Sequence, residues 1–386
     1  MNTVTQFADS ANLDFDAFQT ICAQKTQLAN YPFAKATQKN VLIYDGHQLR
    51  AQLTTQRRAI LSELNYALSN GPGVIVIQAG FDQLAEVDKE SAVFEKILEE
   101  ESKHGVAADH FAKAGANGRI WNSFQKAAVL DPSAFIDYYA NPMIDLVCEA
   151  WLGPWYQMTA QVNVVRPGGE AQQPHRDYHL GFQVVEDIAK FPVQLQVMSQ
   201  LLTLQGAVAH TDMPIESGPT LLLPYSQQYA LGYLAWRDER FKAYFQQHHV
   251  QLPLSKGDLI FFSPALFHAA GNNTTQHLHR MANLLQVSSA FGKPMETIDH
   301  QAMMKAVYPT LLEKVSNNAL SESQLAIAIA MSADGYSFPN NLDKSPPVGG
   351  LAPQTGQQLL ATALSEKWAE AEFFQKVDLH FLAKKA

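Results

Sequence analysis

The sequence has few cysteines and few charged residues. Only Cys22 and Cys148 are cysteines among 386 residues, too few for a disulfide framework and typical of free thiols in a reducing compartment. Charged residues make up 17% of the chain and the formal net charge is −9. No run of Lys and Arg is long enough to bind a phosphate backbone, so nucleic acid is not an expected partner.

Long apolar runs are also missing. No stretch reaches the roughly 18 apolar residues that a membrane-spanning helix needs. Residues 1–16 lack the basic segment and following apolar stretch of a secretory signal. These absences predict a cytoplasmic protein with no membrane partner. Hydrophobic residues still make up 47% of the chain, enough for a substantial core. Nothing in the sequence indicates an oligomeric state.

The hydrophobic pattern of the chain changes twice. Before residue 154 the spacing is mostly helical, and after residue 296 it is helical again. Between these regions, short strand patterns are separated by Gly, Pro and Asp turns. The predicted helices are 53–68, 82–103, 132–152, 302–307, 321–331 and 357–370, with a helical excursion at 229–244. The predicted strands are 74–77, 161–165, 193–197, 221–223, 259–262 and 284–288.

This pattern predicts a mainly β core wrapped by helices from both ends. We expect one domain over residues 1–386. It would consist of an N-terminal helical region with at least one strand (1–154), a β core (155–295) and a C-terminal helical region (296–386). Many short strands bounded by turns are typical of a sandwich or barrel.

One short motif in the β region has the composition of a metal site. In Pro174-His175-Arg176-Asp177-Tyr178-His179, a strand would place His175, Asp177 and His179 on one side. An imidazole and a carboxylate on one face leave room for a third ligand, as in the facial triad of non-haem Fe(II) oxygenases. Alone, the motif is more often a chance pair on a surface or core strand than a metal site.

Two later residues could complete such a site. His268 lies beyond the far end of the apolar strand 259–262, where a barrel would open. A lone histidine there is more often structural, but the upstream motif makes it a candidate third ligand. Arg280 precedes the mostly apolar run 281–287, and its planar fork could bind a carboxylate through two parallel hydrogen bonds. Any single Arg is more often a surface residue.

Together these features resemble the phytanoyl-CoA dioxygenase family within the Fe(II)/2-oxoglutarate oxygenases. The resemblance covers roughly residues 140–290 and implies a double-stranded β-helix, or jelly roll, with the metal at one mouth. The segments that carry it are 163–169, 175–177, Asp212 with 216–221, 224–226, 257–273 and Arg280.

The resemblance also implies roles for individual residues. Fe(II) would be held by His175, Asp177 and His268, and Arg280 would anchor the far carboxylate of 2-oxoglutarate. Related halogenases lack the carboxylate ligand so that chloride can bind, so Asp177 favours hydroxylation of a C–H bond in a small organic substrate. Succinate and CO2 would be the co-products.

Other residues near the motifs are weaker candidates. Gln161 and Asn163 share one face of their strand and could contact the co-substrate. Tyr178, His179 and Phe182 follow the metal motif and could line the substrate pocket. For His179, a strand-end histidine that faces the pocket without binding metal is an equally good interpretation.

Three departures from the family pattern bear on the site. The family usually has P-G-S-H where this chain has Pro-Tyr-Ser-Gln at 224–227, and Ala270 replaces a common hydroxyl residue. The distal histidine and Arg280 are one residue further apart than usual. One extra residue in a strand reverses its facing, so either Arg280 or His279 points inward. We expect Arg280, with loop 272–276 absorbing the extra residue, because only Arg supplies a carboxylate fork.

A non-enzymatic interpretation is the main alternative. The same jelly roll could be a cupin-type module that binds a metal or small ligand without oxygen chemistry. Arg280 favours the enzyme, because a pure metal binder needs no buried carboxylate clamp. A structural protein with a degenerate site is the weakest alternative, given the intact triad. The acidic chain offers no basic groove for coenzyme A, which favours a free small metabolite as substrate.

Overall fold

The computed structural model describes residues 6–103, 117–170, 172–347 and 349–385. The prediction that residues 1–16 hold no secretion signal concerns residues 1–5 in part, and these lie outside the described residues. The strands are β1 (Ala36–Gln38), β2 (Val41–Asp45), β3 (Val74–Gln78), β4 (Asn117–Ile120), β5 (Gln157–Val165), β6 (Thr203–Ala209), β7 (Leu221–Leu222), β8 (Leu259–Phe262), β9 (His268–Ala269) and β10 (Arg280–Ser288).

Eight of these strands form one sheet in the order β1-β2-β3-β8-β6-β10-β5-β4. The β2–β3 pair is parallel and the other neighbouring pairs are antiparallel. Strands β7 and β9 form a separate antiparallel pair. The long strands β5 and β10 pair over their whole length, from Arg280 opposite Val165 to Ser288 opposite Gln157. This register determines which side chains share a face.

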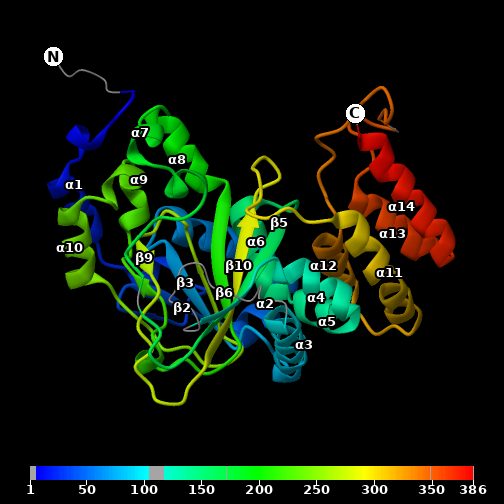
Figure 1. Cartoon of the computed structure of the whole chain (residues 1–386), viewed down its shortest axis with the longest axis horizontal. Coiled ribbons are helices and arrows are strands. Elements are labelled where there is room, and N and C mark those ends of the chain that lie inside the picture. Colours follow the sequence, from blue (N-terminus) through cyan, green and yellow to red (C-terminus); the bar gives the residue numbers. More distant parts are fainter. Residues whose placement is uncertain (1–5, 104–116, 171, 348, 386) are drawn as a thin grey trace.

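Helices lie on both sides of the sheet, and those of the C-terminal region form a block at one end of the molecule (Figure 1). No described helix is long and apolar enough to cross a membrane. The helices are α1 (Phe15–Cys22), α2 (Gly46–Ser69), α3 (Leu84–Lys103), α4 (Ser123–Leu130), α5 (Pro132–Tyr139), α6 (Pro142–Leu152), α7 (Val185–Ile188), α8 (Val193–Leu201), α9 (Gly232–Ala235), α10 (Glu239–His248), α11 (His300–Ser316), α12 (Glu322–Ser332), α13 (Gly356–Glu366) and α14 (Glu370–Lys384).

The two faces of the sheet belong to different hydrophobic clusters. On the outer face, Leu285 and Val287 of β10 pack in a large cluster that includes residues of helices α2 to α6 and α11 to α14. On the inner face, Ala282 of β10 joins a smaller cluster with Ala207 and Phe262. Since side chains alternate along a strand, odd and even positions of β10 serve these two faces.

The predicted β core flanked by helices from both ends is confirmed. The predicted strands at 74–77, 161–165, 259–262 and 284–288 all correspond to strands of the large sheet. The N-terminal region, expected to contain at least one strand, contributes β1, β2, β3 and β4 to this sheet.

The prediction of one helix over 132–152 is wrong. The chain forms α5 and α6 instead, separated at Ala140 and Asn141. The Asn141 side chain accepts hydrogen bonds from the backbone N–H groups of Met143 and Ile144, at 2.8 and 3.3 Å. Pro142 has no N–H to donate and suits the first turn of a new helix. A strong N-cap therefore restarts the helix. At the other end of the chain, the helix predicted over 357–370 is also two helices, α13 and α14.

The prediction of a strand at 193–197 is also wrong, because this segment begins α8. Its Val-Gln-Leu-Gln-Val alternation imitates a half-buried strand. In the helix, Gln196 and Gln200 form the buried side, whereas Leu195, Met198 and Leu201 are partly exposed. The amide of Gln196 bonds the Phe191 carbonyl at 3.0 Å. A helix with its polar residues inward has no sequence pattern that marks it as a helix.

Candidate metal and co-substrate site

Three side chains predicted to bind metal come together at one point. His175, Asp177 and His268 each offer one ligand atom, and these atoms all lie within 4.8 Å of one another. His175 Nε2 is 3.5 Å from Asp177 Oδ1, and His268 Nε2 is 3.4 Å from Asp177 Oδ2. Within the described parts of the chain this is the only such group.

Backbone hydrogen bonds hold the three residues in place. The N–H of His175 donates to the carbonyl of His268 at 3.0 Å, and the N–H of His268 donates back at 3.2 Å. The N–H of Asp177 donates to the Pro264 carbonyl at 3.0 Å. Segments about 90 residues apart in the sequence therefore lie side by side, and extended backbone aims His175 and Asp177 to the same side.

Both imidazoles have a fixed orientation. His175 Nδ1 lies 2.8 Å from the Gln173 carbonyl, and His268 Nδ1 lies 2.8 Å from the Leu266 carbonyl. A carbonyl only accepts, so each Nδ1 carries the proton. Each Nε2 is then left with its lone pair directed at the shared centre, which is the arrangement that second-sphere carbonyls give metal-binding histidines.

The charges of the three groups also suit a cation. Burial raises the pKa of Asp177, but the two histidines outweigh it and hold that pKa well below its usual range. Burial lowers the pKa of His268, which favours the neutral ring. Burial also lowers the pKa of His175, but Asp177 outweighs it and raises that pKa. A carboxylate and two imidazoles are the donor set of the facial triad.

Arg176, between the two ligands of the motif, points the opposite way and is fully buried. One of its guanidinium nitrogens donates to the carbonyls of Ser226 and Tyr229, at 2.6 and 3.0 Å. The guanidinium lies over the rings of Tyr233 and Phe267. Phe267 directly precedes His268. Arg176 therefore links the segment that carries His175 and Asp177 to the segment that carries His268.

Arg280 is buried at the start of β10, and its neighbour His279 is exposed. The extra residue before it is therefore taken up by the preceding loop. There the side-chain N–H2 of Asn273 donates to the carbonyls of Val165 and Leu278 at 3.0 and 2.9 Å. Burial lowers the pKa of Arg280 to about 10. Among the described residues, its guanidinium forms no hydrogen bond and no ion pair, which is costly for a buried cation.

Small and polar side chains separate Arg280 from the triad. Ala282 lies opposite Asn163 on β5 and Ala209 on β6, and directly paired residues share a face. The Oδ1 atom of Asn163 is buried and has no hydrogen-bond partner. At the triad end, Gln205 of β6 donates from Nε2 to Asp177 Oδ2. The inner face therefore has the His-Asp-His group at one end and the buried Arg280 guanidinium at the other, with alanines between them.

A model of the phytanoyl-CoA dioxygenase family matches residues 69–282, which include the triad and Arg280. This chain belongs to the phytanoyl-CoA dioxygenase family. The family consists of 2-oxoglutarate-dependent non-haem iron enzymes, and this coarse assignment applies to the chain. It decides against the non-enzymatic alternative.

Several solved structures are similar to this member of the family, all at low identity. The α-ketoglutarate-dependent epimerase SnoN of nogalamycin biosynthesis is 19% identical, with a TM-score of 0.41, over 60% of this chain and 84% of its own. The carbocyclase SnoK of the same biosynthesis is 20% identical, with a TM-score of 0.42, over 59% and 83%. AviO1 from Streptomyces viridochromogenes Tue57 is 13% identical, with a TM-score of 0.43, over 62% and 97%. No curated protein matches the chain.

Gln161 lies on the inner face of the large sheet, but its side-chain amide is already hydrogen-bonded to neighbouring side chains. Its Oε1 accepts from Arg119 Nη1 at 2.7 Å, and its Nε2 donates to Gln286 Oε1 at 3.3 Å. Arg119 lies opposite Asn163 in the register of β4 and β5. Gln161 is therefore part of a buried polar row in the wall of the site.

Tyr178, His179 and Phe182, the three candidates for the substrate pocket, do not lie in an extended strand that continues from His175 and Asp177. Tyr178 and His179 have positive φ angles of 63° and 38°, and His179 to Phe182 form a 3-10 helix. The expectation that His179 shares the side of His175 and Asp177 in one strand is therefore wrong. The Tyr178 hydroxyl and His179 Nε2 are buried without a hydrogen-bond partner, whereas Phe182 is 52% exposed.

Sequence reasoning missed Gln205 and Arg119, two polar side chains of the inner face. Strand β6 has Thr203, Gln205 and Ala207 on that face, so it lacks the alternation of apolar and polar residues that marks a strand. Its glutamine resembles the solvent-facing residue of an ordinary strand. Only the register with β10 reveals that it faces the site.

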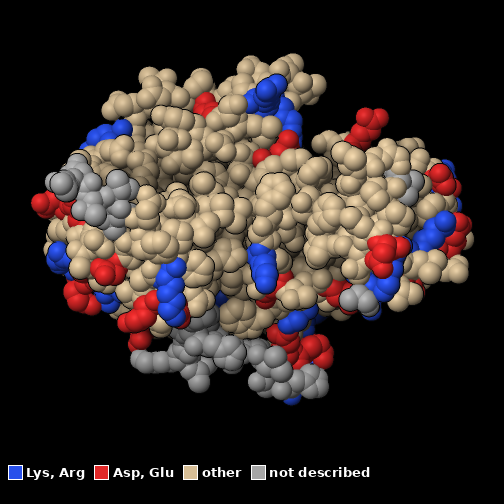
Figure 2. Space-filling view, turned by 90° about the horizontal axis from the view of Figure 1, so that it is seen from above, with Lys and Arg blue, Asp and Glu red and all other residues tan. Residues whose placement is uncertain are grey.

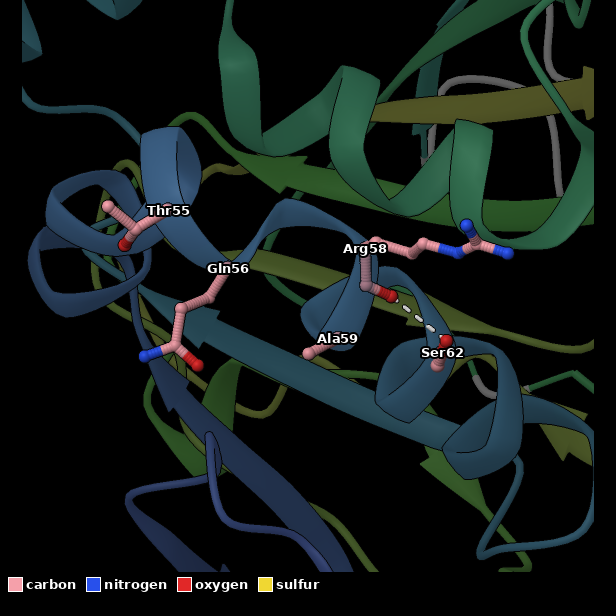
Figure 3. A pocket seen from close by; sticks show the side chains of 5 residues that line it. All are labelled: Thr55, Gln56, Arg58, Ala59 and Ser62. Atoms are coloured by element: carbon pink, nitrogen blue, oxygen red, sulfur yellow. Dashed lines mark hydrogen bonds between the residues drawn. The ribbon is translucent and has the colours of Figure 1, made fainter.

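A hollow on helix α2 is unrelated to this site. All five residues that line it lie on that one helix (Figure 3). Its one drawn hydrogen bond joins the Ser62 hydroxyl to the Arg58 carbonyl at 2.9 Å, an ordinary contact within a helix. The lining residues are Thr55, Gln56, Arg58, Ala59 and Ser62.

Proposed function

We propose that this protein is an Fe(II)- and 2-oxoglutarate-dependent dioxygenase that hydroxylates a C–H bond of a small organic substrate. One observation carries the proposal. A convergent His-Asp-His group lies against the inner face of the large sheet, where Gln205 bonds Asp177, and the same face carries a buried guanidinium with no partner among the described residues. Metal binding alone accounts for the first feature but not for the second.

The residues present fit the two groups that the family uses. His175, Asp177 and His268 would hold Fe(II) with two neutral imidazole nitrogens and one carboxylate oxygen. Arg280 would bind the far carboxylate of 2-oxoglutarate through its planar fork. When bound, Fe(II) and 2-oxoglutarate would activate dioxygen for oxidation of the substrate, and 2-oxoglutarate would be converted to succinate and CO2.

The surrounding residues would position the co-substrate and limit water. Asn163 has a buried Oδ1 atom without a partner, and its amide could meet the co-substrate between the triad and Arg280. Ala207, Ala209 and Ala282 share this face, and their short side chains would suit the carbon chain of the co-substrate. Gln161, held by neighbouring side chains, would stiffen the wall behind. Because Arg280 is buried, its interaction with a carboxylate would be stronger than in water.

We further propose that the large sheet and the β7–β9 pair form the two halves of a jelly roll around the site. Tyr178 and His179 would border the substrate, with Phe182 at the surface beside them. On the face seen from above, Lys and Arg are scattered and form no patch (Figure 2). The net charge of −9 supports a free small metabolite over a coenzyme A thioester, whose phosphates would favour a basic groove.

Anaerobic reconstitution tests the metal and co-substrate part of this proposal. The wild-type protein should bind one Fe(II), and adding 2-oxoglutarate should produce a weak visible absorption band. A metabolite screen for substrate-dependent succinate formation would then identify the substrate. Incorporation of one oxygen atom from labelled dioxygen into the product would establish hydroxylation. A wild-type protein that gives neither the band nor succinate would rule out the proposed function.

A further inference from the structure

Gln205 forms the one side-chain contact to the Asp177 carboxylate from outside the His-Asp-His group, as far as the described residues go. Its Nε2 donates to Asp177 Oδ2. The assignment of the amide is not ambiguous, because a carboxylate can only accept a hydrogen bond. Gln205 lies in the middle of the sheet, between Phe262 of β8 and Gln286 of β10. Its backbone is therefore held on both sides.

The Oε1 atom of Gln205 supports a role for the hydrogen bond from Gln205 to Asp177. This atom is buried and has no hydrogen-bond partner in the part of the chain that the structure describes. A buried carbonyl without a partner costs about 1–3 kcal/mol. An apolar residue of similar length would fill the same space without that cost. The cost is understandable if the N–H2 group is needed at Asp177.

We propose that Gln205 is a positioning residue that makes Asp177 a one-oxygen metal ligand. Each Asp177 oxygen lies close to one histidine, Oδ1 3.5 Å from His175 Nε2 and Oδ2 3.4 Å from His268 Nε2, and the amide bonds only Oδ2, so Oδ1 would be the oxygen for the metal. A carboxylate that turned both oxygens to the metal would take a position that 2-oxoglutarate or dioxygen needs. This inference rests on the proposed function, because it concerns the same metal.

Q205L and Q205M remove the donor while keeping much of the side-chain volume. We expect Fe(II) to bind about 10- to 100-fold more weakly in both, the range typical when an outer partner of a metal ligand is lost. Calorimetry under anaerobic conditions measures this affinity. The band of the Fe(II)–2-oxoglutarate complex should also shift its maximum, which a general loss of stability would not cause. Thermal unfolding of the metal-free proteins verifies that each variant is folded.

Q286L is the matched control. Gln286 is paired with Gln205 on the neighbouring strand and shares its face, but it has no contact with Asp177 among its hydrogen bonds. We expect its Fe(II) affinity to stay within threefold of wild type. A second comparison uses D177A, in which Q205L should cause no further loss because the amide has nothing left to position.

The inference and the proposed function can fail separately. If wild-type protein forms the Fe(II)–2-oxoglutarate band and both Gln205 variants keep its maximum and bind Fe(II) within twofold, Gln205 does not position the ligand. A full additional loss on adding Q205L to D177A would overturn it equally. If one variant does not fold, the other decides. If wild-type protein forms no band at all, the proposed function itself is wrong.

Discussion

Strand β10 carries a buried polar side chain on each face of the central sheet, and these two side chains differ in their partners. On the outer face, Asn283 donates to the hydroxyls of Tyr138 and Tyr139 at 3.1 and 2.9 Å, and His210 bonds the Tyr138 hydroxyl at 2.7 Å. On the inner face, Arg280 of the same strand β10 has no hydrogen bond or ion pair among the described residues. The amide N–H2 of Asn283 is thus satisfied by neighbouring tyrosines, whereas the Arg280 guanidinium has no such partner and would suit a carboxylate ligand.

The largest effect is expected where the inner face would meet the metal. D177A removes the one anionic ligand, so 2-oxoglutarate turnover should be lost entirely, as measured by succinate formation. Removal of an exposed carboxylate in D187A should change nothing. Retained succinate production in D177A would count against the metal assignment and would place Asp177 with the structural groups of the outer face.

The second effect concerns the unpartnered guanidinium. R280L should raise KM for 2-oxoglutarate about 100-fold, equivalent to about 2.7 kcal/mol of binding. R280K keeps a charge but loses the planar fork and should raise it less, about tenfold. Steady-state kinetics with varied 2-oxoglutarate measures both, with R58L on the exposed side of α2 as control. An unchanged KM in R280L would mean that this buried Arg is structural after all.

The third effect tests the support behind the ligands. A Cβ on Gly232 would lie 1.8 Å from Cζ of Arg176, so G232A must displace that guanidinium. Overpacking of this kind typically costs about 1–3 kcal/mol. We expect a lower melting temperature and weaker Fe(II) binding. G350A, where an added Cβ meets nothing within 4 Å, should leave both unchanged. Normal Fe(II) binding in folded G232A would separate Arg176 from the site.

The smallest effect concerns Glu90, a buried carboxyl group on the outer face whose oxygens have no hydrogen-bond partner among the described residues. Glu90 is fully buried, and both its carboxylate oxygens have no hydrogen bond. Burial, together with Asp131, raises its pKa to about 8 from 4.5. Its neutral form therefore contributes stability that is fully present below pH 4.5 and is lost as the pH rises towards 8.

E90Q stays neutral at all pH values and should weaken this dependence. Calorimetry at pH 5 and pH 8 should show a melting temperature that falls a few degrees less in E90Q than in wild type. E99Q, on the exposed side of the same helix, should behave as wild type. Equal pH dependence in E90Q and wild type would show that the outer face does not hold a neutral carboxyl group.

The fold was predictable where side-chain pattern and burial agree. The apolar run 259–262 is one strand with its predicted bounds, because it is buried on both faces. Prediction failed where the pattern contradicts burial. In α8 the glutamines Gln196 and Gln200 are inside and Leu195 is partly exposed, so the sequence imitates a strand. Which element a glutamine lies in depends on neighbours that the local sequence does not contain.

The site was predictable as far as its residues have distinctive chemistry. The His-x-Asp spacing, a later histidine and an Arg before a strand led to residues that do gather on one face. Gln205 and Arg119 could not be found, because an amide or guanidinium in a strand usually faces solvent. Their positions follow from the pairing of β6 with β10 and of β4 with β5. Strand register is a long-range property of the fold.

The order of the strands has a consequence for the chain as a whole. Strand β8 pairs with β3, and β5 pairs with β4, so the region 155–295 receives a neighbour from the N-terminal third on each side. Cut out as a fragment, that region would have two long unprotected edges with free N–H and C=O groups. Such edges template association between molecules. The ligand-bearing region therefore cannot be separated from the sequence that precedes it, although nearly all of the site lies within it.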